Sequence, residues 1–183
     1  INGDARAAAA ALVDRLKGRS LACVANKAER SARIKSEKDA WEQELGAWTH
    51  ETDPFSLEVA RDSQYMHPRQ MLRELEKAMP KHAMVSTDIG NICSVSNSYL
   101  RFEEPRSMFA AMSFGNCGYA FPVICGAKVA APDRPAIAYV GDGAWGISLN
   151  ELLTCAREKI GVTVVVFNNG QWGAEKKNHV DFY

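Results

Sequence analysis

Apolar positions along the chain change their spacing several times, and these changes predict helices and strands. In residues 5–17 the apolar side chains recur at helical spacing, with Asp4 as a candidate N-cap and Gly18 as a stop. Residues 26–44 carry many charged side chains of both signs, which is typical of a solvated helix, with a binding surface as the alternative. Residues 46–64 have the composition of a linker.

The remainder of the chain has the pattern of an α/β domain. Pro68 begins a stretch with one apolar helical face that ends before Pro80. A second helical stretch contains Gly115, Gly118 and Gly126, and residues 148–159 are amphipathic. Three short strand-like runs alternate with these helices: residues 83–86, 136–140 and 162–167. The last two runs are uninterruptedly apolar. We therefore expect an α/β fold, a parallel sheet with helices on both faces.

Composition narrows the class of protein. The chain has 183 residues, of which 46% are hydrophobic and 24% charged, as in a globular protein. Its 22 basic and 22 acidic residues cancel, so neither nucleic acid nor an anionic membrane is expected as a partner. No apolar run reaches the roughly 18 residues of a membrane span. The 5 cysteines form no C-x-x-C pair, which favours a reducing, cytoplasmic location over a disulfide framework or a metal cluster.

A glycine-rich motif follows the second strand-like run. Gly141-Asp142-Gly143-Ala144-Trp145-Gly146 matches G-x-G-x-x-G between a strand and a helix, so a dinucleotide site is the first hypothesis. Two features oppose it. The next strand ends in Asn168-Asn169 where an acidic residue is expected. In addition, the carboxylate of Asp142 would repel a diphosphate unless a cation lay between them.

A divalent cation removes this conflict. Asp142 could bind an ion that bridges to diphosphate oxygens, and a side-chain amide carbonyl at the end of the next strand could complete its shell. Neighbouring parallel strands end at the same edge of a sheet, so Asp142 and Asn169 are expected to face one crevice. Oxygen ligands shared with substrate phosphates are typical of Mg²⁺. The alternative is two glycine-rich turns without a ligand.

The two-ended pattern, Gly141-Asp142-Gly143 followed after a helix and an apolar strand by Asn168-Asn169, resembles the signature of thiamine-diphosphate enzymes. The resemblance implies thiamine diphosphate and Mg²⁺ as cofactors, in an incomplete thiamine-diphosphate-binding fold. It implies three metal ligands: Asp142, the side chain of Asn169 and the main-chain carbonyl of Gln171.

Two upstream segments extend this resemblance. Residues 88–92 are similar to the loop that contacts the diphosphate, and residues 113–119 to the segment around the aminopyrimidine ring, where Gly115 would offer its carbonyl to the 4′-amino group. Cys117 would support the bent cofactor, or is a plain core cysteine. Trp145 and Trp172 are walls of the crevice or core residues. The cofactor-binding residues implied in this way are Asp88, Gly90, Asn91, Ile92, Gly115, Asn116, Cys117, Gly141, Gly143, Ala144 and Trp145.

Residues 109–122 and 171–183 resemble one branch of the family more specifically, the branch that converts sulfoacetaldehyde and phosphate to acetyl phosphate and sulfite. The implied activity is acyl transfer with small-molecule substrates. An acetolactate-synthase-like decarboxylase or carboligase is the alternative within the family. A non-catalytic nucleotide-binding module that uses the glycine motif alone is the second alternative.

The family pattern also implies what lies outside this chain. The glutamate that activates the pyrimidine comes from an N-terminal domain, usually of a neighbouring subunit, and no glutamate here has the context of that role. We therefore expect a homodimer or homotetramer with shared sites, and little activity from this chain alone. Residues 1–18 resemble the end of a preceding α/β domain, residues 19–63 are expected to form a charged helical linker, and residues 64–183 a truncated cofactor-binding domain.

Overall fold

The computed structural model describes residues 3–50 and 66–183. The chain divides into two compact units, Ile1–Gly46 and Ala47–Tyr183. Most of the linker expected at residues 46–64 lies outside the described residues. The candidate chemistry of the sequence lies entirely in the second unit.

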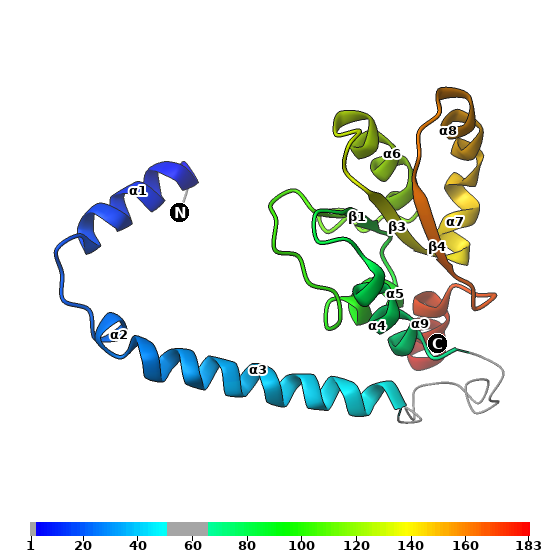
Figure 1. Cartoon of the computed structure of the whole chain (residues 1–183). Coiled ribbons are helices and arrows are strands. Elements are labelled where there is room, and N and C mark those ends of the chain that lie inside the picture. The colour runs from blue at the N-terminus through cyan, green and yellow to red at the C-terminus, as the bar shows by residue number, and fades with distance from the viewer. Residues whose placement is uncertain (1–2, 51–65) are drawn as a thin grey trace. The chain divides into compact units, whose positions relative to one another are not determined.

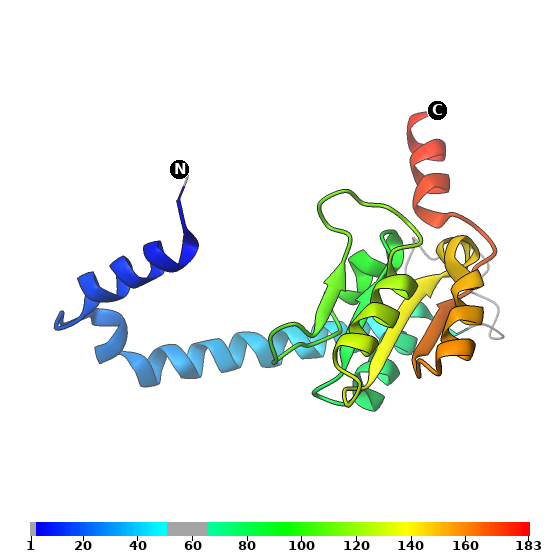
Figure 2. The same cartoon turned by 90° about the horizontal axis from the view of Figure 1, so that it is seen from above.

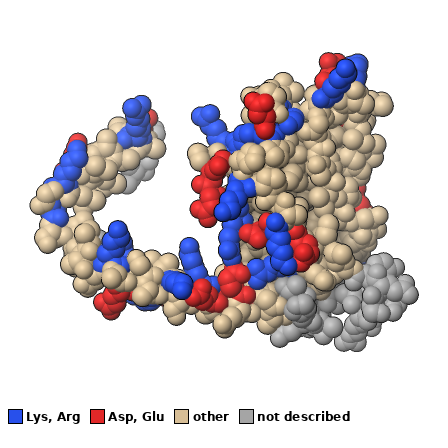
Figure 3. Space-filling model, in the orientation of Figure 1, with Lys and Arg blue, Asp and Glu red and all other residues tan. Residues whose placement is uncertain are grey.

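The first unit is helical. It contains α1 (Ala5–Leu16) and α2 (Ala22–Ala25), and α3 (Lys27–His50) begins in it. The Asp4 carboxylate accepts the backbone N–H of Ala7 at 2.7 Å, which confirms the predicted N-cap. Side chains of both charge signs lie along α3, as Figure 3 shows, and this confirms the predicted charged helix. Within the described ranges, no helix combines the length and apolarity that crossing a bilayer requires.

The second unit is built on a four-stranded sheet (Figure 1). The strands are β1 (Met84–Thr87), β2 (Met108–Ala110), β3 (Ala136–Gly141) and β4 (Thr163–Phe167), in the spatial order β2-β1-β3-β4. Every pairing is parallel. All four strands therefore end at the same edge of the sheet, which confirms the predicted parallel α/β fold.

Helices cover both faces of this sheet (Figure 2). On one face lie α6 (Ala120–Ala130), α7 (Asp142–Ser148), the 3₁₀ helix η2 (Leu149–Glu151) and α8 (Leu152–Glu158). Phe121 and Ile124 of α6 pack there against Ala138 and Val140 of β3. The other face carries α4 (Pro68–Ala78) and α5 (Asn91–Ser96), and a 2.8 Å hydrogen bond between the hydroxyls of Ser96 and Tyr139 joins α5 to β3. The last helix, α9 (Gly173–Phe182), follows β4.

The glycine motif lies between a strand and a helix, as expected. α7 begins at Asp142, directly after β3, so most of the motif forms the first turns of the helix. The amphipathic helix expected over residues 148–159 is instead the 3₁₀ helix η2 followed by α8. Cys155 is buried, whereas Leu149, Leu152 and Leu153 are 43%, 45% and 76% exposed, so the apolar face that these leucines predicted was wrong. This side of the unit, on the right in Figure 3, is largely uncharged.

Three elements had no sequence prediction. β2 has only three residues, all half-buried, and α5 has six, so neither spans enough positions to show a period. α9 has a run of charged and polar residues from Glu175 to His179 and no buried face. β4 was expected to be covered on both sides, but its residues are exposed or half-buried because it is an edge strand of the described sheet.

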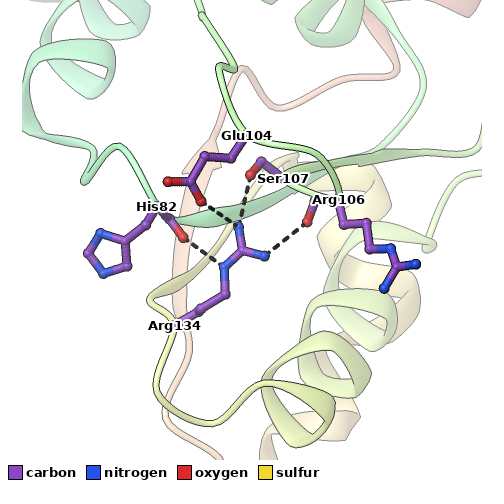
Figure 4. A network of polar contacts seen from close by, with 5 residues as sticks. All are labelled: His82, Glu104, Arg106, Ser107 and Arg134. Carbon is purple, nitrogen blue, oxygen red and sulfur yellow. Dashed lines mark hydrogen bonds and ion pairs between the residues drawn. The ribbon is translucent and has the colours of Figure 1, made fainter.

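Arg134 joins three loops at the amino edge of the sheet, opposite the strand ends that carry the candidate chemistry (Figure 4). Its guanidinium donates to the carbonyl of His82 at 2.9 Å, to the hydroxyl of Ser107 at 2.8 Å and to the carbonyl of Arg106 at 3.4 Å. The Glu104 carboxylate lies 3.9 Å away. One side chain therefore connects the segments that precede β1, β2 and β3.

Candidate functional site

A pocket of about 300 Å³ opens at the carboxyl edge of the sheet. Its walls come from segments that follow different strands and meet there because the strands are parallel. Its lining comprises Pro68, Ile89, Gly90, Asn91, Ile92, Val95, Gly115, Cys117, Gly141, Asp142, Gly143, Ala144, Phe167, Asn168, Asn169, Gln171, Trp172, Gly173, Ala174 and Glu175.

Asp142 and Asn169 meet in this pocket although 27 positions separate them. Gly141 pairs with Phe167 across β3 and β4, so the next residues of both strands lie side by side. The backbone N–H of Asn169 donates to Oδ1 of Asp142 at 3.4 Å. Oδ1 of Asn169 in turn accepts the N–H of Gln171 at 3.2 Å. The three predicted metal ligands thus form one short cluster of oxygen-bearing residues.

Close packing of small residues shapes this end of the pocket. A Cβ atom built on Gly143 would lie 2.7 Å from Cε2 of Trp172, so the indole ring occupies the space that only a glycine leaves open. A Cβ atom on Gly173 would lie 3.3 Å from the side-chain amides of both Asn91 and Asn169. The loop after β1 and the metal-ligand cluster are therefore in close proximity.

The opposite wall contains two glycines with positive φ. Gly90 has a φ of +137° and precedes α5, and Gly115 has a φ of +80°, so both backbone conformations favour glycine. The thiol of Cys117 contacts the carbonyl of Ile89 at 3.7 Å. Burial, followed by the charges of Asp88 and Glu175, raises the pKa of the Cys117 thiol, so the thiol is neutral at physiological pH.

Asp88 lies below these two segments and is fully buried. Its Oδ1 atom accepts the backbone N–H of Tyr119 at 2.7 Å and that of Ala120 at 3.3 Å. Burial raises the pKa of the Asp88 carboxyl, and the hydrogen bonds from the Tyr119, Ala120 and Gly118 backbone act against that rise. This carboxyl is thus bonded to the protein backbone beneath the pocket.

A family model agrees with this architecture. The thiamine pyrophosphate enzyme family, through its C-terminal TPP binding domain, matches residues 88–183, a range that contains every pocket segment except Pro68. The chain belongs to this family. The domain binds thiamine diphosphate, and the resemblance of the glycine motif to the family signature is confirmed.

Individual thiamine pyrophosphate enzymes are similar over the whole chain. A sulfoacetaldehyde acetyltransferase of Castellaniella defragrans is 68% identical over 99% of this chain and 31% of its own length. One from Alcaligenes xylosoxydans xylosoxydans is 64% identical over 100% of this chain and 32% of its length. The mitochondrial acetolactate synthase catalytic subunit of Aspergillus candidus is 28% identical over 78% of this chain and 21% of its length. The chain therefore spans about a third of the length of these two sulfoacetaldehyde acetyltransferases.

A solved structure shows the same fold. The thiamine diphosphate-dependent 4-hydroxybenzoylformate decarboxylase of Rhodococcus jostii RHA1 superposes with a TM-score of 0.60 at 26% identity. The match covers 63% of this chain and 22% of that chain. The parallel sheet and its helices are therefore those of a thiamine-diphosphate-binding domain.

Most cofactor contacts expected from the family resemblance line the pocket. These are Gly90, Asn91, Ile92, Gly115, Cys117, Gly141, Gly143 and Ala144, together with the metal-ligand candidates Asp142, Asn169 and Gln171. Within the described part of the chain, the lining does not include Asp88, Asn116 or Trp145. The Trp145 ring instead packs edge-on against Phe121, with 5.0 Å between centroids.

Sequence reasoning missed Glu175, which lines the pocket beside Trp172. No strand end or motif marks Glu175, and only the turn that leads into α9 brings it to the site. Lys176, the next residue, donates to the side-chain oxygen of Gln171 at 3.0 Å.

Proposed function

We propose that this chain is the diphosphate-binding part of a sulfoacetaldehyde acetyltransferase. The observation that carries the proposal is the graded similarity. Identity is 68% and 64% to two enzymes of that name, over 99% and 100% of this chain, but 28% to an acetolactate synthase, over 78% of it. The reaction would convert sulfoacetaldehyde and phosphate to acetyl phosphate and sulfite.

Thiamine diphosphate, when bound, supplies the nucleophilic carbon and the electron sink for this reaction. The chain's own residues bind and orient the cofactor. The main-chain atoms of Gly90 and Gly115 are accessible because glycine leaves their positions open, with nothing within 4 Å of a Cβ at either. Cys117 lies between these two segments, where its neutral thiol can support a bent ligand by packing.

Magnesium fits the donor set at the other end of the pocket. One carboxylate, one amide oxygen and one main-chain carbonyl, from Asp142, Asn169 and Gln171, form an all-oxygen set that leaves room for phosphate ligands. In the described ranges no three His, Cys, Asp or Glu side chains gather as a metal-binding group, so a softer metal has no comparable site there. The cation would neutralise Asp142 against the diphosphate.

A partner subunit is the expected source of the activating glutamate. Two large apolar side chains flank the aminopyrimidine segment, Met112 at 70% exposure and Phe114 at 90%. Exposed side chains of this size beside a binding site are typical of a surface that another protein domain covers. We propose a homodimer or homotetramer in which this surface meets the domain that completes the site, in the cytoplasm.

The experiment uses the complete protein that contains this chain. Sulfoacetaldehyde, phosphate, Mg²⁺ and thiamine diphosphate are supplied, and sulfite and acetyl phosphate are measured together, with pyruvate as the competing substrate. We expect equal amounts of both products and little turnover of pyruvate. Acetolactate formed from pyruvate, without sulfite from sulfoacetaldehyde, would contradict the proposal and favour the acetolactate-synthase-like alternative.

A further inference from the structure

The buried carboxyl of Asp88 has a role that the pocket lining does not explain. Asp88 directly follows β1, is fully buried and lies outside the pocket lining as far as the described residues show. A buried carboxyl is costly unless hydrogen bonds satisfy it. Its Oδ1 atom has two such bonds, at 2.7 Å to Tyr119 N and 3.3 Å to Ala120 N, whereas Oδ2 is buried without a hydrogen-bond partner.

Those two N–H groups are at the start of α6, where a helix has no internal partners for its donors. The N-cap residue Tyr119 provides no side-chain cap of its own. Asp88 therefore caps α6 from a position 31 residues earlier in the chain, and a carboxyl at this end also interacts favourably with the helix dipole.

The cap joins the two sides of the pocket. The residues that directly follow Asp88, from Ile89 to Ile92, line one side, and the residues that directly precede Tyr119 line the other through Gly115 and Cys117. The 3.7 Å contact of Cys117 with the Ile89 carbonyl is a second connection between the same segments. Losing the Asp88 carboxyl would therefore remove a connection between the two segments that line the pocket.

The segment that precedes α6 is restrained from a third direction as well. Gly118 has a φ of +79°, and a Cβ atom there would lie 2.6 Å from the Ile147 side chain of α7. This segment therefore packs against α7 at Gly118, and the next two residues bond to Asp88.

We propose that Asp88 is a positioning residue, which sets the spacing between the diphosphate loop and the aminopyrimidine segment without contacting thiamine diphosphate itself. The inference rests on the cofactor site and not on the identity of the aldehyde substrate. A buried oxygen without a hydrogen-bond partner, such as Oδ2, lowers stability, so a purely stabilising role does not account for this carboxyl. The raised pKa of the carboxyl agrees with its dry surroundings.

The test measures cofactor binding in the complete protein, by quenching of tryptophan fluorescence with and without Mg²⁺. Asp88→Ala removes the cap, and Asp88→Asn keeps one acceptor oxygen at nearly the same volume. Ser86→Ala is the matched control, because the buried Ser86 hydroxyl also bonds to Ala120, at 2.6 Å to its carbonyl, but is not at the junction of the two segments. Melting temperature is recorded for every variant.

We expect Asp88→Ala to weaken cofactor binding about 10- to 100-fold, the factor that corresponds to one lost hydrogen bond with a charged partner. Mg²⁺ should still tighten binding by the wild-type factor, and Asp88→Asn should recover part of the loss. Ser86→Ala should lower the melting temperature and change cofactor affinity less than about threefold. If Asp88→Ala does not fold, the test compares Asp88→Asn with Ser86→Ala and the wild type.

Two outcomes would overturn the proposal. Cofactor affinity that falls no further than in Ser86→Ala, at an equal loss of melting temperature, would make Asp88 a structural residue only. Loss of the Mg²⁺ effect in Asp88→Asn would make it a direct participant in the metal and diphosphate site. Neither outcome depends on sulfite release, so failure here is distinct from failure of the proposed reaction.

Discussion

The indole ring of Trp172 lies directly over Gly143, 2.7 Å from where a Cβ atom would stand. The two residues come from different strand ends, Gly143 from the first turn of α7 and Trp172 from the turn after β4. Both line the pocket next to Asp142. Their contact brings the two halves of the predicted metal site together.

Gly143→Ala should therefore displace the Trp172 ring and weaken cofactor binding. The new methyl group would overlap the indole, and the ring, which is partly exposed, can move only by changing the pocket wall. We expect thiamine diphosphate affinity to fall about tenfold, as measured by isothermal titration.

Gly146→Ala provides the matched control within the same helix. A Cβ atom there meets nothing within 4 Å, so alanine should be accepted and should stabilise α7 by up to about 1 kcal/mol. Equal cofactor affinities for the two alanine variants would show that the contact with Trp172 does not shape the site.

Asp142→Ala should abolish the dependence of cofactor binding on Mg²⁺. The carboxylate is the single charged member of the proposed ligand set, so we expect a loss of at least about 100-fold in affinity in the presence of Mg²⁺. Asn169→Ala removes a neutral ligand and should cost about tenfold. Titration calorimetry with and without Mg²⁺ measures both effects, and a wild-type Mg²⁺ response in Asp142→Ala would exclude this metal site.

Cys117→Ala should reduce turnover of the complete enzyme more than it reduces stability. The thiol is half-buried in the pocket wall and contacts Ile89, so its removal leaves a small gap below the cofactor and costs about 1 kcal/mol of folding free energy. Turnover and melting temperature are compared in the same preparation. A markedly lower melting temperature with unchanged turnover would favour the plain core role instead.

Arg134→Ala should lower stability without changing cofactor affinity. The guanidinium donates to three acceptors in two loops at the sheet edge opposite the pocket, so its loss leaves these acceptors without their donor and should cost roughly 1–3 kcal/mol. Urea denaturation measures the loss. Arg134→Lys should recover little, because one ammonium group cannot reproduce the fork of donors. A change in cofactor affinity at temperatures where the variant is folded would contradict the prediction.

The thiols of Cys125 and Cys155 lie 3.2 Å apart, and burial together with this contact raises the pKa of Cys125 to about 12. When the pKa of a thiol is higher in the folded protein than in the unfolded chain, folding is favoured. This stabilisation is fully present at any pH below the unfolded-state pKa, which is near 9. This stabilisation is lost as the pH rises from about 9 towards 12. Cys125→Ala should therefore show a smaller loss of stability between pH 8 and pH 10.5 than the wild type, measured by thermal unfolding. Identical pH profiles would argue against this raised pKa.

Much of the fold was evident in the linear pattern. The apolar runs of β3 and β4 and the helical spacing before Gly18 and after Pro68 are local signals, and local signals survive in the folded chain. Helix α1 and its Asp4 cap follow from a few neighbouring residues. The resemblance to thiamine-diphosphate enzymes, carried by the glycine motif and the asparagine pair, is confirmed by the family match.

The sequence by itself also determined that Asp142 and Asn169 would be neighbours. Parallel strands end at one edge of a sheet, so two polar residues directly after adjacent strands must lie side by side wherever such a sheet forms. Tertiary structure alone decided which distant segments are in contact. The burial of Asp88 beside the start of α6 and the packing of Trp172 on Gly143 depend on contacts between segments far apart in the chain. Local spacing carries no information about such contacts, because the free energy that selects them arises only when the segments are packed together.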